Sequence, residues 1–251
     1  MNHKKDFLKE LENYNYGENL YTKFRDFCQS ATYALALPFY PELAAQKLKE
    51  FNFGEDKKKL KAFDNCFEIL TDALETSHTD FLGEFFGENN LTNDRAGQFF
   101  TPYNVSLMSA KMTLHDIDRE LQEKPLITIG EPACGSGGMI IACREVFLEK
   151  KLNPSTQMYV ELTDIDELCF YMAYIQISLY GIAAKVIHGD TLRMTQYKNL
   201  FTPVYFLNNF QFRLMFLDLK EVLTEVKTEE PPEVTIPEIK IYSEEEQLVL
   251  F

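Results

Sequence analysis

Three short runs of strand-forming residues lie in the middle of the chain, at 126–129, 157–160 and 185–187. The stretches between them, at about 138–151 and 166–180, have the apolar spacing of helices. Strands that alternate with helices are joined by right-handed crossovers into a parallel sheet. The sequence therefore predicts an α/β fold.

The first 95 residues have a different pattern. Apolar residues recur at steps of three and four from Leu20 to Ala34 and again from Leu60 to Leu74, which is the period of a helix. A polar connection at 87–94 separates this part from the predicted strands. We expect a helical N-terminal domain over 1–95 and a second domain, which contains the sheet, over 96–228.

The alternation of strands and helices fades after Asp190. One further strand is predicted at 204–207, followed by a helix at about 212–226. Residues 221–251 contain nine Glu and two Lys, so they carry seven of the 14 net negative charges of the chain. Charge repulsion opposes packing of such a segment on a body that is itself acidic. We therefore expect an acidic C-terminal tail over 229–251.

Charge and cysteine spacing limit the classes of function. A net charge of −14 repels phosphate, so binding of DNA would need a local basic patch or a basic partner. The five cysteines are irregularly spaced and never form Cys-x-x-Cys, so we expect reduced thiols and no metal site. No apolar run is long enough to span a membrane and no signal sequence is recognisable, which predicts a cytoplasmic protein.

A glycine-rich segment directly follows the first predicted strand. It reads Glu131-Pro132-Ala133-Cys134-Gly135-Ser136-Gly137-Gly138 and leads into a predicted helix. Glycines allow a sharp turn and close approach of a ligand, and the helix N-terminus offers free N–H groups. A dinucleotide fingerprint would need a third glycine where Ile140 stands. The segment indicates either a nucleoside cofactor without a pyrophosphate or a tight turn that binds no ligand.

Carboxylates follow the next two predicted strands. Asp164 can accept hydrogen bonds from the two hydroxyls of a ribose, whereas Asp166 directly precedes a helix and can serve as its N-cap. Asp190 follows the third strand, where it can accept a hydrogen bond from the exocyclic amine of adenine. Because the carboxyl ends of parallel strands lie at one edge of a sheet, these residues should converge on one adenosine.

Four motifs occur in a fixed order along the chain. They are Gly97-Gln98-Phe99-Phe100-Thr101-Pro102, Glu131 to Gly138, Asp164-Ile165-Asp166 and Gly189-Asp190-Thr191-Leu192. Together they resemble the adenine-N6 DNA methyltransferases that serve as modification subunits of type I restriction-modification systems. The resemblance covers about 81–192 and includes the sequence FLGEFF at 81–86. It implies a Rossmann-like S-adenosylmethionine-dependent methyltransferase sheet with a helical N-terminal domain, S-adenosylmethionine as cofactor and DNA as substrate.

The resemblance implies a role for each matching position. Thr101 and Pro102 would meet the methionine end of the cofactor, and the turn at 132–137 would hold its amino acid and ribose. Asp164 would hold the ribose hydroxyls, and Asp190 would bind the adenine amine. The complete candidate cofactor site comprises Gln98, Phe100, Thr101, Pro102, Glu131, Pro132, Ala133, Gly135, Ser136, Gly137, Asp164, Ile165, Asp190 and Thr191. Without the resemblance, 98–100 would be interpreted as an aromatic loop packed on the core.

The resemblance stops at the catalytic motif. The family carries Asn/Asp-Pro-Pro-Tyr/Phe after its fourth strand, where it binds the target amine and stacks on the flipped base. The only Pro-Pro here is Pro231-Pro232; Thr202-Pro203-Val204-Tyr205 lacks a strong acceptor, and Asn208-Asn209-Phe210 lacks prolines. The family would also continue through further strands and a DNA-facing region, so DNA binding would need a partner subunit.

Two classes of function remain open from the sequence. In the first, the chain transfers methyl groups through an atypical loop or with parts supplied by a second chain. In the second, it is a non-catalytic binding or decoy subunit that engages restriction components, the sliding clamp of DNA polymerase, or both. Catalytic residues are left unassigned.

The last five residues, Gln247-Leu248-Val249-Leu250-Phe251, resemble the pentapeptide with which bacterial replication and repair proteins dock on the sliding clamp of DNA polymerase. Gln247, Leu248, Leu250 and Phe251 would make the contacts. The alternative is that this segment folds back as an edge strand on the protein's own core.

Overall fold

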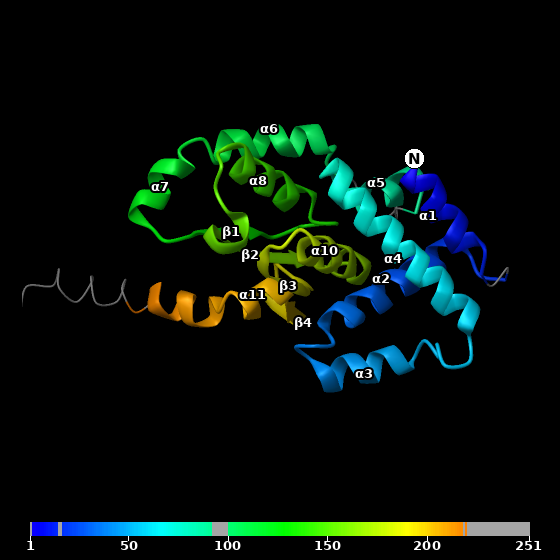
Figure 1. Ribbon diagram of the computed structural model, residues 1–251. Coiled ribbons are helices and arrows are strands. Elements are labelled where there is room, and N and C mark those ends of the chain that lie inside the picture. The colour runs from blue at the N-terminus through cyan, green and yellow to red at the C-terminus, as the bar shows by residue number, and fades with distance from the viewer. Residues whose placement is uncertain (1, 15–16, 92–99, 218, 220–251) are drawn as a thin grey trace, which may run out of the picture. The chain divides into compact units, whose positions relative to one another are not determined.

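A four-stranded sheet forms the centre of the computed structural model (Figure 1). Its strands lie in the order β1, β2, β3, β4, with the bounds Ile127–Glu131, Met158–Asp164, Ala183–Asp190 and Thr195–Phe201. The first three strands are parallel, and β4 is antiparallel to β3. The predicted α/β fold is confirmed. The structure describes residues 2–14, 17–91, 100–217 and 219.

The two central strands bury one face completely. Val160 and Leu162 of β2 and Val186 of β3 share this face and are fully buried, while on the other face Tyr159 and Ile187 are buried and Glu161 is exposed. The helix α8 (Gly138–Glu149) and the short α9 (Pro154–Gln157) join β1 to β2, and α10 (Glu167–Leu179) joins β2 to β3. Both crossovers advance in the same direction along the sheet, so right-handed connections place α8 and α10 on the same face.

Helices also precede the sheet in the chain. They are α1 (His3–Glu12), α2 (Leu20–Ala36), α3 (Pro41–Lys49), α4 (Lys57–Ser77), α5 (Phe81–Glu88), α6 (Tyr103–Thr113) and α7 (Ile117–Glu123). Four of them begin at a side-chain cap that accepts a backbone N–H, namely Asn2, Asn19, Asp56 and Asp80. The helix α6 packs along α8, above β1 in Figure 1.

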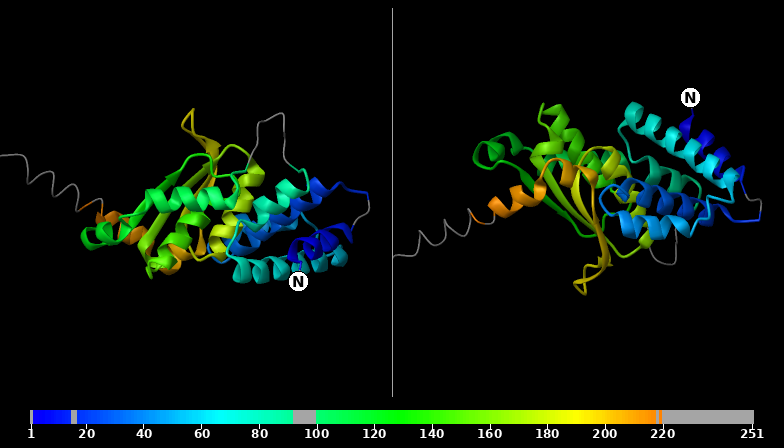
Figure 2. Two further views of the ribbon diagram at one scale, coloured as in Figure 1. Left: turned by 90° about the horizontal axis from the view of Figure 1, so that it is seen from above. Right: turned by 60° about the horizontal axis from the view of Figure 1, so that its bottom comes forward.

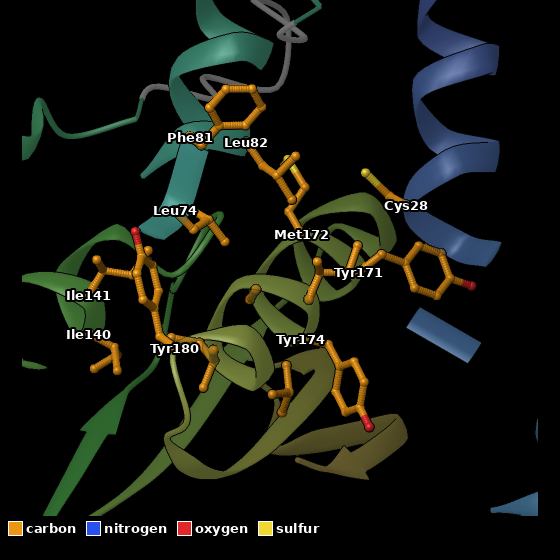
Figure 3. Packing of buried hydrophobic residues seen from close by; sticks show 14 of the residues in the cluster. Cys28, Leu74, Phe81, Leu82, Ile140, Ile141, Tyr171, Met172, Tyr174 and Tyr180 are labelled. Carbon is orange, nitrogen blue, oxygen red and sulfur yellow. The ribbon is translucent and has the colours of Figure 1, made fainter. Parts of the chain in front are cut away.

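The N-terminal helices and the sheet share one hydrophobic core. The helix α2 packs against α10, where the Thr32 hydroxyl donates to the Tyr171 carbonyl over 3.3 Å. Figure 3 shows buried side chains of α2, α5 and α8 gathered around α10. The described residues up to Gln211 form one compact unit. The boundary that we expect between 95 and 96 lies outside the described residues.

The predicted strand at 204–207 is wrong. This segment is the helix α11 (Pro203–Leu207), with Pro203 in its first turn. Proline fixes φ and lacks a backbone N–H, which suits a helix start and excludes a place inside a sheet. The preceding Thr202 ends the sheet, because its hydroxyl donates to the Ile182 carbonyl over 2.7 Å and accepts from the Ala184 N–H over 2.9 Å. A further helical segment occupies 210–217, and residues 218 and 220–226 of the predicted helix lie outside the described residues.

The fourth strand was not predicted, because its sequence has no alternation of apolar residues. It forms the outer edge of the sheet, and within it only Leu200 is buried. The hairpin turn from β3 projects beyond the rest of the sheet in both views of Figure 2. Leu192 and Met194 in this turn are 97% and 87% exposed. An edge strand that is largely exposed to solvent can be polar on both faces. Its sequence then lacks the alternation of apolar and polar residues by which strands are predicted.

Candidate cofactor site

The glycine turn between β1 and α8 has a backbone that favours glycine at two positions. Gly135 has φ +54° and Gly137 has φ +92°, both in the left-handed region. A Cβ at Gly135 would also lie 2.9 Å from the ring of Phe100. Gly137 is the N-cap of α8, so the chain turns sharply into the helix. The expected tight turn at the end of the first strand is therefore present.

Hydrogen bonds tie this turn to the ends of the other two parallel strands. The Cys134 N–H donates to the Thr163 carbonyl over 2.9 Å, and the Gly135 N–H donates to Asp164 Oδ2 over 2.8 Å. The Thr191 hydroxyl donates to the Pro132 carbonyl over 2.7 Å. The three segments that the sequence analysis singled out therefore meet at the carboxyl edge of the sheet.

Asp164 is the central acceptor of this edge. Its second oxygen, Oδ1, accepts from the Asp166 N–H over 2.9 Å. Burial raises the pKa of the Asp164 carboxyl, and the backbone hydrogen bonds oppose that rise. A carboxylate has about four lone-pair sites, so each oxygen can accept a further bond from a hydroxyl. Asp166 caps α10 by accepting from the Leu168 N–H over 2.7 Å, which is the alternative that the sequence left open for it.

Two further predicted residues flank Asp164. Ile165 exposes 63% of its surface and so presents an apolar side chain beside the carboxylate. Asp190 is largely enclosed, and its Oδ1 accepts from the Arg193 N–H over 3.0 Å at the start of the hairpin turn. Asp190 thus stabilises the hairpin turn between β3 and β4, and the remaining lone pairs of its carboxylate can accept hydrogen bonds from other donors.

A cavity of about 140 Å³ lies beside the glycine turn. Six of the predicted residues line it: Phe100, Thr101, Glu131, Ala133, Gly135 and Ser136. Pro102 is exposed at the start of α6, and Gln98 lies outside the described residues. The Phe100 ring packs edge-on against Phe86, with centroids 5.6 Å apart.

The same cavity wall contains a buried carboxyl group that was not among the residues predicted from the sequence. Asp80 is 5% exposed, and its Oδ2 accepts a hydrogen bond from the Ser136 hydroxyl over 2.5 Å. Ser106 and Met139 also line the cavity and were not predicted. Asp80 immediately precedes the FLGEFF sequence, so its position at the start of that motif was the available signal.

Comparison of the sequence with known protein families identifies the family of this chain. Residues 73–230 match the N-6 DNA methylase family, which is more than half of the chain. The chain belongs to this family. A solved structure from Listeria monocytogenes, described as a class I S-adenosylmethionine-dependent methyltransferase, is similar with a TM-score of 0.45 and 14% identity. The match covers 76% of this chain and 54% of the other, so the chain spans about half the length of that protein. No curated protein matches it.

The cofactor of an N-6 DNA methylase is S-adenosylmethionine, and the chemistry of the site fits it. The cavity wall carries the carboxyl group of Glu131, which suits a ligand with ammonium and sulfonium charges. Asp164 suits a ribose, and the exposed Ile165 suits the flat face of a base. When bound, the cofactor supplies an electrophilic methyl group.

The two segments considered as acceptors of the target amine lie at the opposite edge of the methylase sheet. Asp190 at the carboxyl end of β3 pairs with Thr195, whereas Lys185 near its amino end pairs with Phe201. These two pairs are five residues apart along β3, about 17 Å. Because β4 runs back along β3, the residues after Phe201 emerge at the amino edge.

Side-chain contacts hold both segments there. Tyr205 is buried with its ring stacked on Phe201 at a centroid distance of 4.1 Å. The Asn208 amide donates to the Ser155 carbonyl over 2.8 Å, next to the start of β2. Neither segment can hold a target amine beside a cofactor at the carboxyl edge.

Other site chemistries find no support in the described residues. The structure holds no cluster of three or more His, Cys, Asp and Glu side chains there that could bind a metal ion. All five cysteines are free and buried, and burial raises the pKa of the Cys134 thiol well above its usual range. No helix in the described part of the chain has the length and apolar character needed to cross a bilayer.

Proposed function

We propose that this methylase-family chain is the cofactor-binding part of an adenine-N6 DNA modification subunit of the type I restriction-modification kind. The observation that carries the proposal is the convergence of the glycine turn with Asp164 and Thr191 at one sheet edge. In this arrangement Asp164 receives the ribose hydroxyls, and the cavity beside Glu131 receives the methionine end of the cofactor. The edge of β3 near Asp190 then lies next to the adenine.

Transfer of the methyl group would need a second chain. Adenine N6 must lose a proton as it gains the methyl group, so an acceptor has to hold the amine at the carboxyl edge. No residue in the two candidate segments reaches that edge. Among the described residues β1 has no partner on its outer side, and Thr128 and Gly130 are exposed there. A strand from a partner that pairs with β1 could bring an acceptor loop to the cofactor.

Binding of DNA is assigned to the same complex. A net charge of −14 opposes approach of a phosphate backbone, so a basic partner subunit would supply the contacts to DNA. In the alternative, the chain binds cofactor and partner without catalysis, as a decoy subunit. The clamp peptide at Gln247 to Phe251 lies outside the described residues, and docking on the sliding clamp is proposed from its sequence alone.

Calorimetry and label transfer test these proposals together. We expect the purified chain to bind S-adenosylmethionine or its demethylated product, and Asp164→Ala to weaken that binding. We expect no label transfer to mixed-sequence DNA by the chain alone, and transfer when cell extract supplies a partner. Absence of binding at millimolar cofactor would contradict the site, and robust transfer by the isolated chain would contradict the need for a partner.

A further inference from the structure

The carboxyl group of Asp80 joins three segments that are far apart in the chain. It caps α5, where Oδ1 accepts from the Gly83 N–H over 3.0 Å. The same oxygen accepts from Gln176 Nε2 in α10 over 2.8 Å, and Oδ2 accepts from the Ser136 hydroxyl in the glycine turn. One side chain therefore links the N-terminal helices, α10 and the cofactor turn.

Gln176 makes further hydrogen bonds to the glycine turn and to α5. Its Nε2 also donates to the Ser136 carbonyl over 2.8 Å, and its Oε1 accepts from the Leu82 N–H over 3.0 Å. Gln176 is fully buried, as are Ser136 and Asp80 to within a few per cent. Ser136 is thus held through both its hydroxyl and its backbone, which leaves the turn little freedom between Gly135 and Gly137.

Two glycines make this close approach possible. A Cβ on Gly83 would lie 2.3 Å from both Asp80 Oδ2 and Ser136 Oγ, and a Cβ on Gly138 would lie 2.8 Å from Asp80 Oδ2. Neither glycine needs a left-handed backbone, since no positive φ is found at either. Their small size therefore serves the contact between α5 and the turn.

Capping a helix with a buried carboxylate costs the solvation free energy of the charged group. The hydrogen-bond partners of Asp80 are an amide, a hydroxyl and a backbone N–H, so within the described part of the chain no bonded cation offsets the loss of solvation. Burial raises the pKa of Asp80, and the negative charge of Glu84 raises it further, against the three hydrogen bonds. Asp56 caps α4 by the same kind of bond from an exposed position, which shows that capping alone does not require burial.

We propose that Asp80 is a positioning residue for S-adenosylmethionine: through Ser136 and Gln176 it fixes the glycine turn, which makes the N-terminal helices part of the cofactor site. This inference rests on the proposed function, because the turn is the part that meets the cofactor. It assigns α5 a role in binding, since any displacement of α5 would be transmitted to Ser136 through the Asp80 carboxyl group and the Gln176 amide.

The test compares three variants of the full chain. Asp80→Ala removes all three bonds, Asp80→Asn keeps the shape and can still accept from Gly83 and donate to Ser136, and Asp56→Ala removes a cap away from the turn. Calorimetry measures affinity for the demethylated cofactor, and hydrogen–deuterium exchange without cofactor measures opening of the turn at 133–138. We expect Asp80→Ala to lose about tenfold or more in affinity and to exchange faster at 133–138, because several hydrogen bonds are lost together.

Asp80→Asn should restore affinity to within about threefold of wild type, or 0.7 kcal/mol, and restore slow exchange. Asp56→Ala should lower the melting temperature and leave both other readouts unchanged. If Asp80→Ala fails to fold, Ser136→Ala removes one of the bonds, and exchange at 133–138 without cofactor is then the deciding measurement, because Ser136 itself lines the cavity.

Each outcome separates this inference from the proposed function. Wild-type affinity and exchange in Asp80→Ala would overturn the inference and leave the cofactor site intact. If the wild type binds no cofactor, the proposed function fails, and exchange at 133–138 still decides whether Asp80 orders the turn. Loss of affinity in Asp80→Asn with slow exchange retained would show direct contact of the carboxylate with the ligand and overturn the positioning role.

Discussion

The backbone N–H of Gly135 donates to the carboxylate of Asp164 over 2.8 Å, across 29 residues of sequence. The bond joins the end of β2 to the turn after β1, so the residue proposed to hold the ribose also shapes the turn that holds the amino acid. A change at Asp164 therefore acts on the ligand directly and through the turn.

Asp164→Ala should weaken binding of the demethylated cofactor by about tenfold or more, because it removes the ribose acceptor and the partner of Gly135. Asp166→Ala is the matched control, since it removes the cap of α10 and should cost about 1 kcal/mol of stability with affinity unchanged. Calorimetry and thermal unfolding give both quantities. Equal affinity of the two variants would mean that Asp164 does not meet the ligand.

Gly135→Ala should destabilise the protein by about 1–2 kcal/mol from its left-handed backbone alone, and by more from the clash with Phe100. Gly130→Ala in β1 meets no atom within 4 Å and should be close to neutral. Combining Gly135→Ala with Phe100→Leu should restore the stability lost to the clash with the ring, but not the stability lost to the left-handed backbone. The free energy of unfolding in urea checks all three, and a neutral Gly135→Ala would contradict the described turn.

The pKa of Asp80 is raised by burial above its ordinary value of 3.8, so the folded state binds its proton more tightly than the unfolded state does. Stability from this group is complete below pH 3.8 and is lost as pH rises through the folded-state pKa. Asp80→Asn cannot ionise, so its stability relative to wild type should improve as pH rises through that window. Unfolding titrations from pH 4 to 8 measure the difference, and parallel pH profiles would show that Asp80 is not buried as a carboxylate.

Tyr205→Ala and Asn208→Ala should leave cofactor affinity unchanged, because both residues lie at the amino edge of the sheet. Tyr205→Ala should still cost about 3 kcal/mol of stability, since it removes a buried aromatic ring. Where extract supports methyl transfer, neither change should abolish it in protein that remains folded. Loss of transfer in a stable Asn208→Ala variant would restore that residue as a candidate acceptor.

A peptide spanning Tyr242 to Phe251 should bind the bacterial sliding clamp with a dissociation constant on the order of micromolar, because ordering a short segment offsets much of the gain from a few apolar side chains. Fluorescence polarisation with purified clamp measures it. Leu250→Ala with Phe251→Ala is the control peptide. Equal binding of the two peptides would reject docking through this motif.

The sequence by itself determined the three parallel strands and the residues at their ends, because alternation of apolar residues and glycine-rich turns are local signals. It also placed Asp166 among possible caps, since a cap depends only on the next three residues. These features need no knowledge of distant contacts.

The tertiary structure decided what depends on pairing between distant segments. The polar strand Thr195–Phe201 exists because β3 offers it an edge, and its reversed direction carries Tyr205 and Asn208 away from the cofactor site. Asp80 and Ser136 are 56 residues apart, and their contact requires two glycines and a buried amide from a third segment. Such contacts follow from where packing brings the chain together, which the spacing of residues along the sequence does not encode.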